Sequence, residues 1–378
     1  MKVGLDLDGL NLQSGGIGRY AVNLINHLNP LLKDSPQDEM LVFFHHSFEK
    51  GLIRKKSHMK FIPEFTRVKS NVLRKGVFLP LALRKWDLDL FHGVDHVGLP
   101  FLYKDKKCQY IVTIHDLITR IFPYKFSFKH RLIQNSLLSL VLRKADKVIA
   151  VSRSTKQDLL RFYPQCEEKI KVIYEGVEPH FYPRNAQEVQ RVRRKYHIDQ
   201  NYFLFLGTLE PRKNIGRVVE SFIRFKQETP AELKLVITGR KGWLYKGILE
   251  QIRRSPYSQD LLFTDFVEDE DLPALYSGAE VFLYPSLYEG FGLPLLEAMA
   301  CGAPVITSNG SSLRELAEGS ALLVNPWKED QLIQAMKRMI KDSQIKTQLK
   351  KKGLERVKEF SWRKTAEETL KLYKEISR

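Results

Sequence analysis

The chain has 378 residues, which at about 150 residues a domain is enough for two domains. It has a net charge of +17 and only three cysteines, Cys108, Cys166 and Cys301, which lie far apart in the sequence. Sparse cysteines without a CxxC pair exclude a disulfide framework and a cysteine zinc site, and they fit a reducing compartment. No apolar run approaches the ~20 residues of a membrane span, and Asp6 and Asp8 would interrupt a signal core. We expect a cytoplasmic protein that is neither exported nor membrane-spanning.

The positive charge is concentrated in the first half of the chain. Residues 1–180 hold 29 Lys and Arg against 18 Asp and Glu, and residues 51–147 alone hold 20 against 7. A nucleic-acid-binding protein could have such a surplus, but no helix-turn-helix, zinc or aromatic RNA-binding motif is present. A partner other than nucleic acid is expected to use this charge, unless it serves only solubility.

The first half alternates short apolar runs with helical patterns. Lys2–Leu7 predicts a strand, and a glycine loop containing Gly15 and Gly16 leads into a helix with apolar residues at helical spacing. Gly16, Gly18 and Ala21 match part of a dinucleotide fingerprint, but the next predicted strand does not end in the acidic residue that NAD binding requires. Further strands are predicted at 40–44, 88–91, 109–114, 148–151 and 171–174, and a helix is predicted at 127–144.

Residues 61–86 mix apolar and basic side chains, and Pro63 and Pro80 are expected to break any long helix there. Such a stretch most often covers a core. The alternative is a surface for an acceptor or an anionic membrane. On that interpretation apolar residues enter the headgroup region beside basic ones. The apolar residues are Val72, Leu73, Val77, Phe78 and Leu79, and the basic ones are Arg74, Lys75, Arg84 and Lys85.

Two histidines follow predicted strands of the first half. His92 follows the strand at 88–91 and His115 the strand at 109–114, so both lie at carboxyl strand ends, where open parallel sheets bind ligands. A histidine at such a position is more often structural than catalytic. We select His115 as the functional candidate and keep His92 as the weaker one.

The second half repeats the strand and helix alternation after a predicted polar connector at 178–200. The strand at 202–206 leads to Arg212 and Lys213, just before a predicted helix at 215–225. A planar guanidinium and a point charge beside a helix N-terminus suit a diphosphate. A solvated basic turn is the alternative. Further elements are predicted at 233–238 (strand), 261–266 (strand), 312–318 (helix), 321–324 (strand), 328–341 (helix) and 343–358 (helix).

Residues 279–308 carry the strongest pattern, predicted as strand, glycine loop, helix and strand. Pro294 suits the first turn of the helix and Gly302 its C-terminal cap. In the loop, Gly290 lets a ligand approach the backbone. Glu289 and Glu297 lie before and within the helix, where they could face one ligand, or merely occupy a turn and complement the helix dipole.

The run YEGFGLPLLEAMACGAPV at 288–305 resembles the acidic motif of retaining glycosyltransferases of family four, which have the GT-B fold. GTLEPRKN at 207–214 resembles the family's phosphate loop and TIHDL at 113–117 its N-domain segment. The run beginning at Glu175 resembles the hinge entry, which normally has Asn there. The resemblance implies that Glu289 contacts the donor sugar and Glu297 the ribose. It implies further donor contacts by Gly15, Gly16, His115, Arg212, Lys213, Val267, Gly290, Phe291, Gly292 and Leu293.

The resemblance implies an α/β protein of the GT-B fold, with two doubly wound Rossmann-like domains facing each other across a cleft. Residues 1–180 are expected to form an acceptor-side domain and residues 181–361 a nucleotide-sugar domain, with a terminal helix at 362–378 crossing back onto the first.

The expected reaction transfers a hexose from a nucleotide sugar to a saccharide or polyprenyl-diphosphate-linked acceptor in surface-glycan synthesis, with retained anomeric configuration. GDP-mannose is the preferred donor and a UDP-hexose the alternative. No cofactor or metal is expected, because protein cations can stabilise the diphosphate. A sugar-binding protein and a glycoside hydrolase remain alternatives, although a hydrolase does not need the loop of Arg212 and Lys213.

Overall fold

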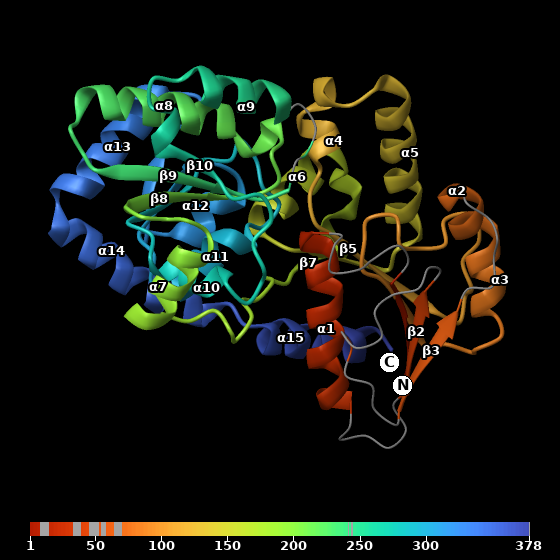
Figure 1. Cartoon of the computed structure of the whole chain (residues 1–378). Coiled ribbons are helices and arrows are strands. Elements are labelled where there is room, and N and C mark those ends of the chain that lie inside the picture. The colour runs from red at the N-terminus through yellow and green to blue at the C-terminus, as the bar shows by residue number, and fades with distance from the viewer. Residues whose placement is uncertain are drawn as a thin grey trace. The chain divides into compact units, whose positions relative to one another are not determined.

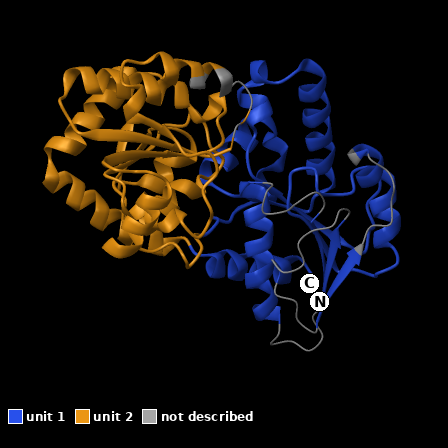
Figure 2. Cartoon of the chain, viewed as in Figure 1, with its two compact units in different colours: residues 1–176, 361–378 blue, residues 177–360 orange. Residues whose placement is uncertain are grey.

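The computed structural model describes residues 1–7, 15–32, 39–44, 53, 58–63, 70–240, 242 and 245–377. These form two compact units, each built on one parallel β-sheet (Figures 1 and 2). Unit 1 comprises residues 1–176 and 361–378, and unit 2 comprises residues 177–360. The terminal helix therefore belongs to unit 1.

The sheet of unit 1 has the order β3-β2-β1-β4-β5-β6-β7, and every neighbouring pair is parallel. Its inner strands are short apolar runs that are buried almost throughout, as expected for a parallel sheet covered on both faces, whereas the edge strands β3 and β7 are only partly buried. The strands are β1 (Lys2–Asp6), β2 (Glu39–Phe44), β3 (Met59–Pro63), β4 (Leu90–Gly93), β5 (Gln109–Ile114), β6 (Lys147–Ala150) and β7 (Ile170–Val172).

Helices of unit 1 bury apolar side chains against this sheet. One core joins the strands to α3, α5 and α6, while α1 packs on α15, where the Tyr20 and Trp362 rings meet edge to face at 5.9 Å. The helices are α1 (Gly16–Leu32), α2 (Asn71–Leu73), α3 (Leu79–Leu83), α4 (Ile118–Ile121), α5 (Phe128–Lys144), α6 (Arg153–Phe162) and α15 (Trp362–Ile376), with 3₁₀ turns at Pro123–Lys125 and Pro164–Lys169.

The segment around Pro80 corrects a prediction. α2, a π-helical turn (Arg74–Phe78) and α3 form one helical run, and Pro80 lies in the first turn of α3, where its missing amide costs little. Pro80 therefore does not break the run.

Burial in this run also revises the predicted membrane surface. Arg74, Lys75 and Leu79 are only 2%, 4% and 1% exposed, so a role at a membrane surface is wrong for these three residues. Exposed apolar side chains remain along the run, and Arg84 and Lys85 are exposed at its end. The exposed apolar residues are Val72, Leu73, Val77, Phe78 and Leu81.

Unit 2 is also a parallel sheet with helices on both faces (Figure 1). Its strand order is β10-β9-β8-β11-β12-β13. The strands are β8 (Asn201–Leu206), β9 (Leu233–Thr238), β10 (Leu261–Phe263), β11 (Val281–Tyr284), β12 (Val305–Ser308) and β13 (Leu322–Val324). The helices are α7 (Ala186–Lys195), α8 (Ile215–Glu228), α9 (Tyr245–Arg254), α10 (Leu272–Ser277), α11 (Leu293–Ala300), α12 (Ser311–Ala317), α13 (Glu329–Lys341) and α14 (Ser343–Arg356), with 3₁₀ turns at Pro211–Lys213, Ser258–Asp260 and Val357–Glu359.

The predicted polar connector at 178–200 is wrong, because α7 occupies its middle. Asn185 and Glu188 form a capping box, in which the Asn185 side chain accepts from the Glu188 amide at 2.9 Å and the Glu188 side chain accepts from the Asn185 amide. The helix was missed because it buries only one fully apolar position, Val192.

Both units are Rossmann-like, so the predicted α/β class is confirmed. The predicted strands of unit 2 are found, although the one at 261–266 ends at Phe263. Among the helices that the structure describes, none combines the length and apolar character needed to cross a bilayer.

Candidate active site

The candidate site of unit 2 lies where the strand order of its sheet reverses. β8 and β11 are neighbours, with β9 on the far side of one and β12 on the far side of the other. Open parallel sheets bind ligands beyond the carboxyl ends of such a strand pair. The loop after β8 carries Arg212 and Lys213, and the loop after β11 carries Glu289. The two loops are joined, because the Leu287 amide donates a 2.8 Å hydrogen bond to the Arg212 carbonyl.

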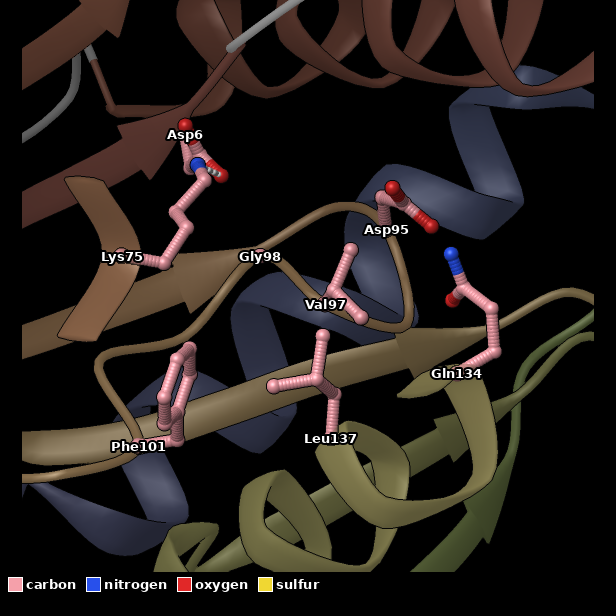
Figure 3. Close-up of a pocket in the computed structure, with 8 residues that line it drawn as sticks. All are labelled: Asp6, Lys75, Asp95, Val97, Gly98, Phe101, Gln134 and Leu137. Atoms are coloured by element: carbon pink, nitrogen blue, oxygen red, sulfur yellow. Dashed lines mark hydrogen bonds and ion pairs between the residues drawn. The ribbon is translucent and has the colours of Figure 1, made fainter. Parts of the chain in front are cut away.

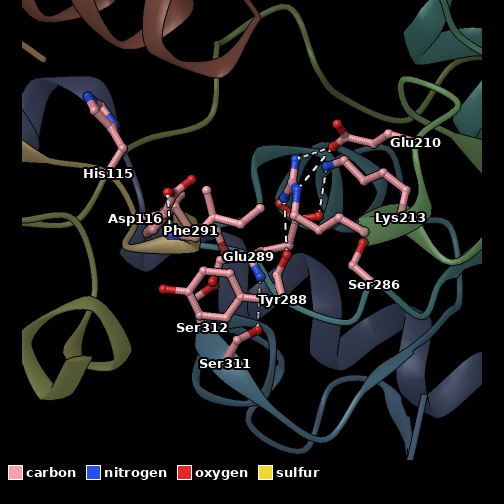
Figure 4. A network of polar contacts seen from close by, with 12 residues as sticks. His115, Asp116, Glu210, Lys213, Ser286, Tyr288, Glu289, Phe291, Ser311 and Ser312 are labelled. Carbon is pink, nitrogen blue, oxygen red and sulfur yellow. Dashed lines mark hydrogen bonds and ion pairs between the residues drawn. The ribbon is translucent and has the colours of Figure 1, made fainter. Parts of the chain in front are cut away.

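Glu289 contacts both cations that were predicted to bind phosphate (Figure 4). Lys213 Nζ lies 2.7 Å from Oε1, and Arg212 Nη1 lies 2.5 Å from Oε2. The Tyr284 hydroxyl lies 3.0 Å from Oε1 and accepts a 2.9 Å hydrogen bond from Lys213. Arg212 also contacts Glu210, at 2.6 Å. Two cations and two carboxylates thus balance, and a phosphate would compete with the carboxylates for the cations.

Neighbouring positive charges keep the Glu289 carboxyl ionised. Burial raises its pKa, but Arg212 and Lys213 outweigh burial and lower the pKa to about 2. Burial and the Glu289 carboxylate raise the pKa of Tyr284 well above its usual value, so this hydroxyl stays a donor. Glu289 is therefore an anionic acceptor at neutral pH, which suits sugar hydroxyls.

The helix after the glycine loop, α11, begins and ends as predicted. Gly292 has φ of +121°, a region that side chains rarely adopt, and Pro294 lies in the first turn of α11. Gly302 has φ of +72° just after the helix, as predicted for a C-terminal cap.

Two serines of α12 hold this loop, and sequence analysis gave them no role. Ser311 Oγ accepts a 3.2 Å hydrogen bond from the Glu289 amide. Ser312 Oγ lies 2.9 Å from the Glu289 carbonyl and also contacts the Phe291 carbonyl. The two consecutive serines at a predicted helix start were the only hint of this role in the sequence. Their partners could not be predicted, because they depend on the tertiary fold.

Glu297 lies in α11 and is 3% exposed. The Tyr276 hydroxyl of α10 donates a 3.0 Å hydrogen bond to its Oε2. The structure thus places Glu297 in the same βαβ segment as Glu289, with a separate partner. The other predicted donor residues of unit 2 are Val267, which is buried after β10, and Gly290, Phe291 and Leu293, whose expected contacts use the backbone.

His115 lies in unit 1, directly after β5, and is 8% exposed. Its Nδ1 is 3.1 Å from Glu175 Oε1, and its Nε2 donates a 2.9 Å hydrogen bond to the Val94 carbonyl. Burial lowers the pKa of His115, but Glu175 outweighs it and the pKa is raised. With both ring nitrogens acting as donors, His115 is not a free base. Glu175, at the position where the family normally has Asn, is its partner.

His92, the weaker candidate, is fully buried in unit 1. Its Nδ1 is 2.6 Å from the Tyr373 hydroxyl of α15 and its Nε2 2.8 Å from Thr113 Oγ1. Burial, helped by His115, lowers the pKa of His92 to about 3. These contacts assign His92 to the packing of α15.

Gly15 and Gly16 are exposed in unit 1 where α1 begins. Gly15 has φ of +72°, which explains a glycine, whereas Gly16 has open space where a Cβ would lie and no unusual φ. Nothing in the described structure requires a glycine at position 16. A ligand that approached the backbone there closely would explain it.

Two family models together match most of the chain. "Glycosyltransferase Family 4" matches residues 14–181, and "Glycosyl transferases group 1" matches residues 188–356. The O-antigen chain mannosyltransferase B of Escherichia coli is 28% identical over 383 residues, which cover 99% of this chain and all of that protein. The serotype-specific mannosyltransferase WbdA of Escherichia coli is 31% identical over 233 residues, but this match spans only 28% of WbdA.

A solved structure shows the same fold over the full length. Sucrose-phosphate synthase from Thermosynechococcus elongatus superimposes with a TM-score of 0.79 at 22% identity, covering 100% of this chain and 99% of that one. Together with the family models, this likeness confirms the GT-B fold. The chain therefore belongs to the mannosyltransferase-like family-four glycosyltransferases of the GT-B fold, and it is a hexosyltransferase that uses a nucleotide sugar.

Proposed function

We propose that the chain transfers mannose from GDP-mannose to a saccharide or polyprenyl-diphosphate-linked acceptor in surface-glycan synthesis, retaining the anomeric configuration and without a metal ion. The observation that carries the proposal is the cluster of Arg212, Lys213 and Glu289 at the strand-order reversal of unit 2. The mannosyltransferases among its relatives support mannose. A UDP-hexose is the alternative donor.

Donor binding would exchange partners within this cluster. The diphosphate takes Arg212 and Lys213, and the freed Glu289 carboxylate accepts hydrogen bonds from sugar hydroxyls. When the bond between the anomeric carbon and the diphosphate oxygen breaks, negative charge develops on the leaving group, and the two cations stabilise it. The acceptor hydroxyl oxygen forms the new bond to the anomeric carbon on the same face of the sugar, and its proton passes to the departing diphosphate oxygen.

The remaining donor contacts follow the family motif. Glu297 holds the ribose hydroxyls, and the backbone near Val267 meets the base. Amides from Gly290 to Leu293 and the glycine loop of Gly15 and Gly16 contact the sugar and phosphates. Gly292 supports this role, because its positive φ lets the loop turn sharply into the N-terminus of α11.

His115 is proposed to position the donor sugar rather than to act as a base. Both of its ring nitrogens have partners, so the ring reaches a sugar hydroxyl by exchanging the Val94 carbonyl for it while Glu175 keeps its orientation. His115→Ala should then lower turnover and leave nucleotide affinity unchanged. Wild-type turnover in this variant would contradict the role.

A thermal-shift screen with nucleotide sugars tests the donor. A ligand at a hundred times its Kd stabilises by about 2.7 kcal/mol, and GDP-mannose should give the largest shift. The Arg212→Ala variant should lose most of that shift, because it lacks the guanidinium fork. A largest shift with a UDP-hexose would favour the alternative donor, and no shift with any nucleotide sugar would remove the proposal.

The reaction course is tested on the product. Proton NMR should show the donor's anomeric configuration retained, and turnover should persist in EDTA. An inverted anomer, or activity that returns only with a divalent ion, would contradict the mechanism.

We also propose that the chain works in the cytoplasm at the inner face of an anionic membrane. The exposed apolar residues of α2 to α3 and the exposed Arg84 and Lys85 support this docking. More exposed apolar side chains lie in and before α5. They are Tyr124, Phe128, Leu132 and Ile133.

A further inference from the structure

Unit 1 has its own strand-order reversal, and a cavity of about 70 Å³ lies there (Figure 3). β1 and β4 are neighbours, with β2 beyond one and β5 beyond the other. Asp6 is the last residue of β1, and Asp95 follows the end of β4 by two residues. Both carboxylates therefore line a cavity at the position where parallel sheets bind ligands. This position corresponds to that of the Glu289 cluster in unit 2.

The backbone around Asp95 is tightly packed. The Gly98 amide donates a 2.8 Å hydrogen bond to the Asp95 carbonyl, which closes a tight turn after β4. A Cβ on Gly98 would lie 2.8 Å from Gly93 Cα and 3.1 Å from Asp6 Oδ2, so only glycine fits between the turn, the strand and the cavity.

The charges around the cavity balance. The Lys75 ammonium contacts the buried Asp6 carboxylate, and Asp95 Oδ1 lies 2.7 Å from His96 Nδ1. Burial lowers the pKa of His96, but Asp95 outweighs it and raises the pKa to about 9. A further cation, Arg74, and a further carboxylate, Asp116, lie within electrostatic range of these pairs, as does His115, whose charge is paired with Glu175. A balanced set favours a neutral ligand over a phosphate or a metal ion.

Gln134 of α5 also lines the cavity, and its Oε1 is buried. The His96 ring lies within hydrogen-bonding reach of this amide, but no hydrogen bond to Oε1 has good geometry. A ligand hydroxyl in the cavity would be a better-placed donor to this buried acceptor. Phe101 and Leu137 line the same cavity with apolar surface.

We propose that this cavity binds hydroxyl groups of the acceptor saccharide, an inference that rests on the proposed transferase function. Carboxylates and the amide oxygen accept from hydroxyls, Lys75 and the amide nitrogen donate to them, and the apolar walls pack against the ring C–H groups. A site that holds a water needs only about 10–15 Å³, so the cavity admits a few hydroxyl-sized groups, that is, one edge of a sugar ring.

The test measures glycoside binding to the full chain by saturation-transfer NMR, with the methyl glycosides of mannose, galactose and N-acetylglucosamine as probes. At least one glycoside should bind the wild type. Gln134→Leu and the isosteric Asp95→Asn should each weaken that binding about three- to tenfold, the usual effect of one hydrogen bond. Gln157→Leu, an exposed glutamine of α6 in the same unit, should leave it unchanged.

Nucleotide-sugar thermal shifts in the same variants separate this inference from the proposed function. The shifts should equal those of the wild type in all three variants, because the donor residues of unit 2 are untouched. If no probe binds the wild type, or if folded Gln134→Leu and Asp95→Asn bind it as the wild type does, the acceptor site is not this cavity. A wild type that binds a glycoside but no nucleotide sugar would instead overturn the proposed function.

Discussion

At the scale of single residues, Glu289 and Glu297 are expected to have different roles. Glu289→Ala removes the carboxylate shared by Arg212 and Lys213 and leaves both cations available to a nucleoside diphosphate. We expect turnover to fall about a hundredfold, while the affinity for the free nucleotide is kept or increased. Glu297→Ala removes the proposed ribose acceptor and should weaken free-nucleotide binding about tenfold or more.

Calorimetry of GDP binding and steady-state kinetics measure the two effects. Glu270→Ala, which removes an exposed carboxylate of unit 2, is the control and should change neither quantity. Equal losses of nucleotide affinity in Glu289→Ala and Glu297→Ala would show that the division of roles is wrong.

The pKa of Glu289 makes stability depend on pH. Because its pKa in the folded chain, about 2, lies below the ordinary value of 4.5, the contribution to stability is fully present above pH 4.5 and is lost as pH falls toward 2. The difference corresponds to stabilisation of the order of 3 kcal/mol at neutral pH. Urea unfolding at pH 6, 4 and 3 should show the wild type losing its advantage over Glu289→Gln as pH falls. An advantage that stays constant over this range would contradict the assigned pKa.

The sequence identified Arg212, Lys213 and Glu289 as candidates, because their chemistry and motif are local. Their mutual contacts were not predicted, since Glu289 was expected at the sugar and the cations at the phosphates. Partners that come from distant segments, such as Glu175 for His115 and Ser311 for Glu289, depend on strand order and register, which one sequence does not contain.

At the scale of elements, α7 provides a test of local capping. Asn185→Ala removes the acceptor of the capping box and should destabilise the helix by about 1 kcal/mol. Hydrogen exchange followed by mass spectrometry should show faster exchange of the first-turn amides. Gln187→Ala, exposed in the same helix, is the matched control. Equal exchange in both variants would mean that contacts with α10, rather than the cap, hold the helix start.

Elements with several apolar residues were predicted, and the mostly polar α7 was not. α8 and the strands of unit 2 follow their apolar runs. α7 was not predicted, because its sequence is mostly polar. In α7 the local preference for helix was present, as its capping box shows, but the helix lacks the apolar run on which the prediction relied. The helical run around Pro80 was not predicted, because a proline usually ends a helix, whereas here a π-helical turn precedes it and the run continues.

At the scale of the whole molecule, the alternation of strands and helices predicted two Rossmann-like units. The strand orders, and therefore the places where they reverse, could not be read from the sequence. Those reversals explain why residues far apart in the sequence, such as Lys213 with Glu289 and Asp6 with Asp95, line common sites.

The charge of the first half gives the last prediction. Each Lys or Arg near an anionic leaflet contributes about 1 kcal/mol, so Arg84 and Lys85, beside the exposed Leu73, Phe78 and Leu81, are expected to contribute to reversible docking. In sedimentation, the chain should bind liposomes that contain anionic lipid, and binding should fall as salt rises.

Reversing both charges tests which surface is used. The Arg84→Glu and Lys85→Glu double variant should bind anionic liposomes at least tenfold more weakly, since the change of four charge units turns attraction into repulsion. The same reversal at Lys351 and Lys352, exposed on α14 of unit 2, changes the net charge equally and should have little effect if docking uses unit 1. Equal losses in the two double variants would mean that net charge alone drives adsorption. A wild type that ignores anionic liposomes at low salt would remove the membrane proposal, while the family assignment, which rests on the two matched models, would stand.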